Sequence, residues 1–281
     1  DIDRLVTVFK FSYSLALLAF VIILVMAAIF QEQTTAADKG IHPAAAFFIF
    51  WFLICWLGMM EGGQGALVGL QPIEKDRYSE THPKTLLNTR LAHMGDNMER
   101  FIVGRQFLVV LVVFVINMMA FAIKDPEVLG LNQTIIEIFF NTGIAVILVT
   151  IMLGQLTAQV NAANCMLDFL NNYFMLFTTY VSLAIEISGL LHSVYLVQII
   201  FSKITGKPIA SKEEPRSAIQ NLFFWGRVLM SLAILGFAFA VTLKALFDGN
   251  TTMWAGVPEA VSVIVFFVLM CFVGMMEGMQ I

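Results

Sequence analysis

Residues 50–64 read FWFLICWLGMMEGGQ, and residues 266–280 read FFVLMCFVGMMEGMQ. Nine of the fifteen positions are identical at an offset of 216 residues, and they include a glutamate and a glutamine at the end of a long apolar run. A second match, between residues 14–20 and 231–237, extends the similarity toward the N-terminus. Internal duplication in an apolar chain is typical of secondary transporters.

The composition indicates a membrane protein. The chain is 59% hydrophobic and 13% charged, whereas ordinary globular domains are nearer half apolar and a quarter charged. Its apolar runs have the length of about 20 residues that a helix needs to cross a bilayer. The net charge of −4 argues against a nucleic-acid partner. Three cysteines are too few for a disulfide framework. We therefore predict an all-α polytopic membrane protein.

The apolar segments predict a bundle built from two homologous, inverted five-helix repeats. Residues 1–201 are predicted as the first repeat, with an amphipathic loop helix over 83–100. Residues 202–217 are predicted as a basic linker, and residues 218–281 as the first two spans of a truncated second repeat. The sequence is therefore expected to be a fragment of a longer chain. The seven candidate spans are residues 5–30, 44–60, 101–123, 134–154, 167–201, 218–247 and 258–276.

The fifth candidate span, over residues 167–201, is too long for one straight crossing and is expected to be broken. Its path decides on which side of the membrane the linker lies. Basic residues favour a cytoplasmic loop over 71–100 and a cytoplasmic N-terminus. Five spans per repeat would then place the basic linker outside, whereas a six-span repeat would place it inside. The basic residues of the loop are Lys75, Arg77, Lys84, Arg90 and Arg100.

The second half of the same loop has an apolar residue at every third or fourth position, which predicts one amphipathic helix on the membrane surface. His82 and His93 also lie in this loop, and we predict that both are solvated rather than metal ligands. The predicted apolar face consists of Leu87, Leu91, Met94, Met98 and Phe101.

The first copy of the duplicated motif has polar side chains that share one helix face. Glu61 and Gln64 are three residues apart, which places them together on a helix. The glycines Gly62, Gly63 and Gly65 are expected to weaken the helix and to free backbone carbonyl groups. A buried glutamate beside such a break is a candidate functional site. The alternative is that Glu61 only ends a helix at the level of the lipid headgroups.

The second copy repeats the same chemistry with Glu277, Gly278 and Gln280. The duplication favours a functional site over a helix end. Carboxylate, amide and free carbonyl oxygens suit a small cation, or a neutral solute with several hydroxyl groups.

Two further polar motifs interrupt apolar sequence. Gly104, Arg105 and Gln106 lie near the start of the third predicted span. Arg105 either extends to the interface or pairs with Glu61 while Gln106 faces the same cavity, and Gly104 is a further predicted helix break. The motif Cys165-Met166-Leu167-Asp168 is either functional or a helix start at which the helix dipole favours the aspartate.

These motifs together resemble the diatom silicon transporter family. The resemblance rests on Glu-Gly-x-Gln at residues 61–64 and 277–280, Gly-Arg-Gln at 104–106 and Cys-Met-Leu-Asp at 165–168. It covers essentially the whole sequence and implies ten spans in two repeats, a plasma-membrane location and sodium-coupled uptake of silicic acid. A second Gly-Arg-Gln, which a duplicated site would include, does not occur in these 281 residues.

The resemblance implies roles for the polar residues. Glu61 and Glu277 would accept hydrogen bonds from silicic acid or bind Na⁺, and Arg105 would pair with a glutamate. Cys165 and Asp168 would form a secondary motif. Movement of one repeat against the other would alternate the access to a shared site. Donor and acceptor groups would come from three amides, Gln64, Gln106 and Gln280.

Other functions fit the same residues. A passive channel for a small neutral solute could use this polar lining without any dependence on sodium, and a coupled transporter of another small polar solute would have the same pattern. Enzyme motifs are absent from the sequence, so we predict no catalysis and no cofactor other than Na⁺ as the coupling ion. The expected partners are silicic acid, Na⁺ and the lipid bilayer, and the oligomeric state is left open.

Overall fold

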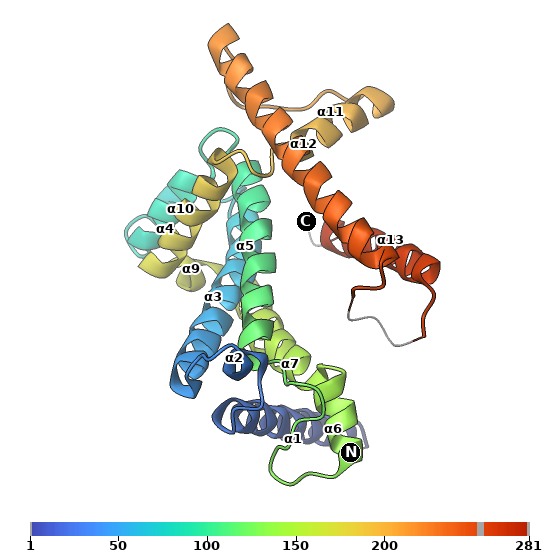
Figure 1. Ribbon diagram of the computed structural model, residues 1–281. Coiled ribbons are helices and arrows are strands. Elements are labelled where there is room, and N and C mark those ends of the chain that lie inside the picture. The colour runs from blue at the N-terminus through green and yellow to red at the C-terminus, as the bar shows by residue number, and fades with distance from the viewer. Residues whose placement is uncertain (1, 252–255, 280–281) are drawn as a thin grey trace. The chain divides into compact units, whose positions relative to one another are not determined.

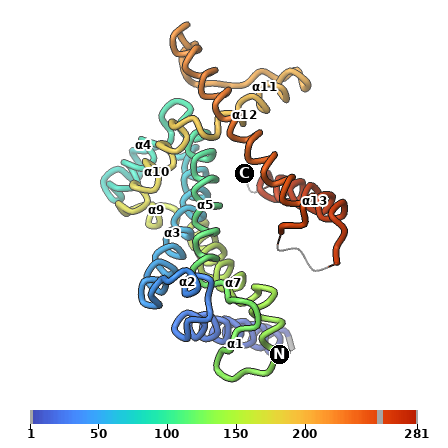
Figure 2. The backbone as a smooth tube through the Cα atoms, viewed as in Figure 1, coloured from blue at the N-terminus to red at the C-terminus, as the bar shows by residue number. Residues whose placement is uncertain are grey.

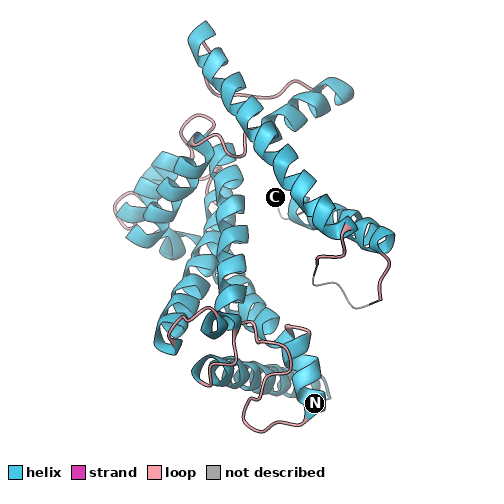
Figure 3. Cartoon of the chain, viewed as in Figure 1, coloured by secondary structure: helices cyan, strands magenta, loops and turns pink. Residues whose placement is uncertain are grey.

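The computed structural model describes residues 2–251 and 256–279. Within these residues the chain forms helices joined by loops, without a strand (Figure 1, Figure 3). Six helical runs are long and apolar enough to cross a bilayer, which confirms the predicted all-helical membrane class. They are α1 (Ile2–Phe30), α3 (Pro43–Gly69), α5 (Asn97–Ala120), the run Ile144–Asn164, α12 (Ala218–Phe247) and α13 (Glu259–Gly278).

The chain divides into two units, and each is described by itself. The first contains Asp1–Ile187 and Ser211–Glu214, and the second contains Ser188–Ala210 and Pro215–Ile281. The two-repeat architecture remains a prediction. The shorter elements are α2 (Thr35–Asp38), η1 (Lys75–Arg77), α4 (Pro83–Ala92), α6 (Gln133–Ile136), η2 (Glu137–Asn141), α7 (Ile144–Val149), η3 (Thr150–Leu156), α8 (Thr157–Asn164), α9 (Met166–Leu170), α10 (Tyr173–Ile187) and α11 (Ser193–Thr205).

Helices α3 and α5 run side by side through the first unit (Figure 1). Helix α3 begins at Pro43, where the missing N–H costs nothing, and the Nδ1 atom of His42 accepts a hydrogen bond from the backbone N–H of Ala44 at 3.2 Å. Within the run Ile144–Asn164, η3 and α8 pack on α3 while α7 packs on α1, and α10 packs on α5. Buried apolar side chains fill the centre of the unit, among them Val25, Phe50, Leu57, Ile116 and Val149.

Helix α4 packs against α9 and α10 (Figure 2) through a polar face. Thr85 donates a hydrogen bond to the carbonyl oxygen of Leu167 at 2.7 Å, and Asn88 donates one to the carbonyl oxygen of Leu170 at 2.9 Å. The side chains of Thr85 and Asn88 are both fully buried. They satisfy carbonyl groups of the short helix α9 that have no partner within the helix itself.

The predicted single helix over 83–100 is wrong. The chain leaves α4 after Ala92, turns at Gly95 with a φ of +55°, and starts α5 at Asn97. The predicted apolar face is wrong for the same reason, because the turn separates its members. Leu87 and Met94 are exposed, while Met98 and Phe101 are buried as part of α5.

The fourth crossing lies further along the chain than the predicted span over 134–154. Gly143 adopts a left-handed conformation with a φ of +75°, which ends the preceding helical segment and allows a new helix to start at Ile144. The crossing helix then extends to Asn164 and includes the polar stretch Thr157–Asn164. Residues 150–156 within it are π-helical, a distortion that is frequent at functional sites.

The fifth predicted segment is broken, as expected. Helix α10 ends at Ile187, the chain turns at Gly189 with a φ of +85°, and α11 begins at Ser193. A second break, at Asn171 and Asn172, separates α9 from α10. The segment is therefore three short helices, and none of them reaches the 18 residues of the six long runs.

The second unit consists of α11, α12 and α13. Helix α12 starts with a capping box, in which the Ser217 hydroxyl accepts a hydrogen bond from the N–H of Gln220 and the Gln220 side chain accepts one from the N–H of Ser217. Ser231 in the same helix donates a hydrogen bond to the carbonyl oxygen of Leu190 at 2.7 Å. The stacked rings of Phe239 and Phe267 connect α12 to α13.

Candidate functional site

The duplicated motif does not unwind its helix. Helix α3 continues from Pro43 to Gly69, so the prediction of freed carbonyl groups is wrong. A Cβ atom at Gly62 would lie 2.5 Å from the ring of Phe169, and one at Gly63 would overlap the side chain of Met175. These glycines therefore allow close packing between helices. Four of the five glycines predicted to break helices lie inside helices, namely Gly62, Gly63 and Gly65 in α3 and Gly104 in α5, whereas Gly278 is the last residue of α13.

Gly104 brings α5 against α10. A Cβ atom at this position would overlap the backbone carbonyl oxygen of Ser182 and lie 3.3 Å from the backbone nitrogen of Glu186. The backbones of the two helices touch here, as small residues permit in membrane proteins. This contact fixes the position of the next residue, Arg105, within the unit.

Glu61 and Arg105 form an ion pair between α3 and α5. The Nη1 atom of Arg105 lies 3.3 Å from the Oε1 atom of Glu61, and the two side chains are only 2% and 8% exposed. The predicted pairing of these residues is confirmed, and Arg105 does not extend to an interface. The other carboxylate oxygen of Glu61 accepts a hydrogen bond of 3.0 Å from the Nε2 atom of Gln159 in α8. Three helices thus contribute to one polar cluster.

Gln106 and Gln64 complete the cluster, and they differ in their hydrogen bonds. The Nη2 atom of Arg105 donates a hydrogen bond of 3.0 Å to the Oε1 atom of Gln106. Gln64 lies one turn after Glu61 on the same face of α3, and it is 6% exposed. Its Oε1 atom has no hydrogen-bond partner among the described residues, and the same holds for the Nε and Nη1 atoms of Arg105.

Such free polar atoms are uncommon inside a protein, because a buried donor or acceptor without a partner costs about 1–3 kcal/mol. The Nη1 atom of Arg105 is close to Glu61 but is not aligned for a hydrogen bond with it. The cluster therefore has a free acceptor on Gln64 and free donors on Arg105. A bound molecule with both hydroxyl donors and hydroxyl acceptors could satisfy them.

The structure places the motif of residues 165–168 at the start of α9. Cys165 and Asp168 are both exposed, and Cys165 occupies the break between α8 and α9. The Oδ1 atom of Asp168 lies 3.3 Å from the Nε2 atom of His82. With the hydrogen bonds from α4 to the carbonyl groups of Leu167 and Leu170, these contacts connect the motif to α4.

Neither histidine of the loop is isolated, contrary to the prediction from sequence. His82 contacts Asp168, and the Nε2 atom of His93 lies 2.9 Å from the carbonyl oxygen of Leu67 at the end of α3. Burial lowers the pKa of His93 below its usual value, and this effect exceeds the opposing effect of the hydrogen bond to Leu67. In the part of the chain that the structure describes, no three or more His, Cys, Asp and Glu side chains are grouped to hold a metal ion.

The second copy of the motif belongs to the second unit. Glu277 lies half-buried near the end of α13, and Gly278 is the last residue of that helix. Gln280 lies outside the described residues. The convergence of the two copies on one site therefore remains a prediction.

Gln159 is the member of the cluster that sequence reasoning missed. It lies in a polar stretch, TAQVNAAN, which follows the apolar part of the fourth crossing. The packing of Gly58 against Ala158, with a distance of 3.2 Å from an added Cβ, places this stretch against α3. The sequence feature that could have identified Gln159 is a polar residue next to small residues, such as Ala158, in a long helix.

The six apolar helices and the buried ion pair define a polytopic helical membrane protein with charged side chains inside its spans. Such side chains mark solute or ion pathways in membrane proteins. The model of the silicon transporter family matches residues 4–281. The chain therefore belongs to the silicon transporter family. It matches no curated protein and no solved structure.

Proposed function

We propose that this protein takes up silicic acid across the plasma membrane, and that the cluster of Glu61, Gln64, Arg105, Gln106 and Gln159 binds the solute. Membership of the silicon transporter family supports silicic acid as the substrate. A transporter of this kind performs no chemical step, which agrees with the prediction that the protein is not an enzyme.

The observation that carries the proposal is the buried pair of Glu61 and Arg105 with free hydrogen-bonding atoms beside it. The charges of the pair cancel, so the cluster suits a neutral solute better than an ion. Silicic acid is neutral at physiological pH and has four hydroxyl groups that both donate and accept. Its hydroxyl groups could donate to the free oxygen of Gln64 and accept from the free N–H groups of Arg105.

We further propose that the coupling ion binds elsewhere than at Glu61. The guanidinium of Arg105 lies within 3.3 Å of this carboxylate, and a like charge so close would repel Na⁺. Glu277, the other carboxylate of the duplicated motif, is the better candidate for an Na⁺ ligand. Alternating access, driven by the Na⁺ gradient, would then connect ion and solute.

Uptake of silicic acid into proteoliposomes, with and without an Na⁺ gradient, tests the proposal. We expect accumulation above equilibrium only with the gradient. The Glu61→Gln variant should lose about 10- to 100-fold of its uptake at limiting solute, because hydrogen bonds to a charged group contribute about 1.5–3 kcal/mol. The Glu99→Gln variant makes the same change at an exposed position of α5 and should keep normal uptake.

Other outcomes would point to the alternative functions. Equilibration that is indifferent to sodium would indicate a passive channel and overturn the coupling. Normal uptake by a correctly inserted Glu61→Gln variant would remove the cluster from the pathway. Stronger uptake of another small neutral solute, such as glycerol or boric acid, would retain the cluster but change the substrate.

A further inference from the structure

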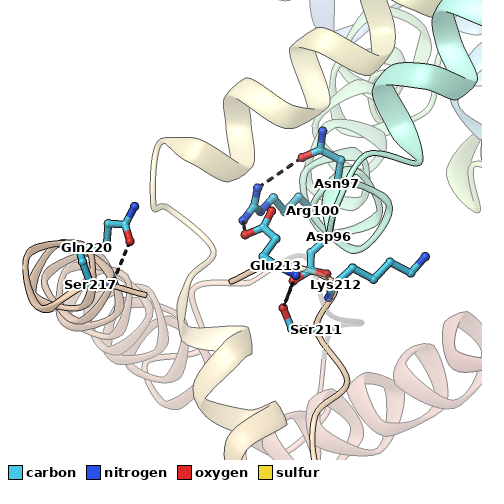
Figure 4. Close-up of polar contacts among 8 residues, drawn as sticks. All are labelled: Asp96, Asn97, Arg100, Ser211, Lys212, Glu213, Ser217 and Gln220. Carbon is cyan, nitrogen blue, oxygen red and sulfur yellow. Dashed lines mark hydrogen bonds and ion pairs between the residues drawn. The ribbon is translucent and has the colours of Figure 1, made fainter. Parts of the chain in front are cut away.

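Residues Ser211–Glu214, which we call the strap, lie on the loop that leads into α5 (Figure 4). The Ser211 hydroxyl donates a hydrogen bond of 2.6 Å to the Oδ2 atom of Asp96, and the backbone N–H of Lys212 donates one of 2.8 Å to its Oδ1 atom. One carboxylate therefore binds two consecutive residues of the strap.

The third strap residue forms an ion pair. The Nη2 atom of Arg100 lies 2.7 Å from the Oε2 atom of Glu213, and Arg100 is also oriented by a bond of 3.4 Å to the Oδ1 atom of Asn97. The carboxylate of Glu213 lies against Gly95, where an added Cβ atom would be 2.9 Å from its Oε1 atom. The strap thus occupies a surface that the turn before α5 forms.

The strap holds the helix that carries the candidate site. Arg100 precedes Arg105 by five residues in α5, which corresponds to about 7.5 Å along the axis. Any change that releases the strap would free the first turn of this helix and the loop before it.

The contacts also place the strap on one side of the membrane. Asp96 and Arg100 lie at the end of the basic loop over 71–100, which the positive-inside rule assigns to the cytosol. The strap touches both residues, so it lies on the same face. It is therefore exposed to cytosolic ATP and to protein kinases.

We propose that Ser211 is a phosphorylation site, and that its phosphorylation releases the strap. Ser211 is exposed, and Glu213 and Glu214 follow it at the second and third positions, an acidic pattern suited to a kinase with a basic substrate groove. In this step the Ser211 oxygen attacks the γ-phosphorus of ATP and forms a P–O bond. The bond from this phosphorus to the β–γ bridging oxygen breaks, ADP leaves with the electron pair, and the hydroxyl proton passes to the catalytic base of the kinase.

The product cannot keep the present contact with Asp96. The hydroxyl donor is lost, and a phosphate with a charge of about −1.5 to −2 takes its place beside a carboxylate. The hydrogen bond from Ser211 lowers the pKa of Asp96, so this carboxylate is ionised at neutral pH and repels the phosphate. Arg100, a cation of the same surface, is already engaged by Glu213.

The test combines phosphate mapping with hydrogen exchange on the purified protein. An acidophilic serine kinase with ATP should phosphorylate Ser211 and leave Ser217 unmodified, because Ser217 lacks acidic residues at the following positions. Exchange of the Lys212 amide, whose N–H binds Asp96, should become about tenfold faster, in line with the loss of a hydrogen bond to a charged group.

Two variants separate modification from fold. The Asp96→Asn variant should accelerate exchange of the Lys212 amide without any kinase. In the Ser211→Ala variant, treatment with the kinase should leave the exchange of the Lys212 amide unchanged. Two results would overturn the proposal. One is the absence of phosphate on Ser211 in the native protein, and the other is phosphorylated protein whose Lys212 amide stays protected, which would mean that Arg100 captures the phosphate and keeps the strap bound.

Discussion

The Arg105→Met variant should lose about 3–5 kcal/mol of folding stability, because it leaves Glu61 as a buried charge without its partner. Both side chains are almost fully buried, so solvent cannot replace the lost guanidinium. Uptake of silicic acid should disappear as well. Equilibrium unfolding in mixed detergent micelles measures the stability, and uptake into proteoliposomes measures the function.

A double variant separates the two effects. Glu61→Met with Arg105→Met removes both charges and should recover most of the stability, since apolar pairs replace buried ion pairs at little cost. It should still fail to transport. The Arg90→Met variant removes an exposed arginine of α4 and serves as the control. If Arg105→Met unfolded like the native protein, the ion pair would not be a buried element of the fold.

The Gly104→Ala variant should be destabilised by about 3 kcal/mol, the upper end of the usual overpacking cost. The added methyl group would overlap a backbone carbonyl oxygen of Ser182, and backbone cannot rotate away as a side chain can. Helices α5 and α10 must then separate and carry Arg105 away from Glu61. Both the free energy of unfolding and the uptake of silicic acid should therefore fall in this variant.

Gly65→Ala is the matched control for this prediction. It adds the same methyl group inside α3, where no atom lies within 4 Å of the new Cβ. The variant should be as stable as the native protein or more stable by about 0.5–1 kcal/mol, because alanine favours a helix. A strong loss of stability in Gly65→Ala, or none in Gly104→Ala, would contradict the packing that the structure shows.

From the sequence, the pairing of Glu61 with Arg105 was one of two alternatives, since an arginine within an apolar stretch either extends to the interface or pairs with a carboxylate. The sequence did not predict the role of the neighbouring glycines. Glycines such as Gly62 and Gly63 can either unwind a helix or allow another helix to pack closely. Which of the two occurs here depends on Phe169 and Met175, which lie more than a hundred residues away in the sequence. Gln159 was missed because its contact depends on the rotational register of α8 against α3, which hydropathy does not encode.

Helix boundaries were the weakest part of the prediction for a similar reason. Hydropathy placed the fourth crossing over the most apolar stretch, residues 134–154. In the structure the left-handed turn at Gly143 precedes the helix, which extends through polar residues to Asn164. In α4 the pattern of leucines and methionines predicted an apolar face, but Thr85 and Asn88 are buried instead. The carbonyl groups of α9, which these polar side chains satisfy, are invisible in the local sequence.

The strap also limits how the chain can cross the membrane. Since Ser211–Glu214 touches Asp96 and Arg100, the chain returns to the face that it left at the start of α5 and makes an even number of crossings between. Helix α5 and the run Ile144–Asn164 provide two, so α10 and α11 together add none or two. At 15 and 13 residues they are about 20–22 Å long, short of the 30 Å hydrocarbon core.

Inverted five-span repeats require an odd number of crossings at this point, with the loop and the linker on opposite faces. The strap favours repeats that run in the same direction, related by an axis along the membrane normal. Single cysteines at Lys75 and Lys207 should then react with a membrane-impermeant reagent from the same side of sealed vesicles, and reaction from opposite sides would restore the inverted arrangement. An even number of crossings would also mean that the chain enters α12 from the same face of the membrane as it enters α1.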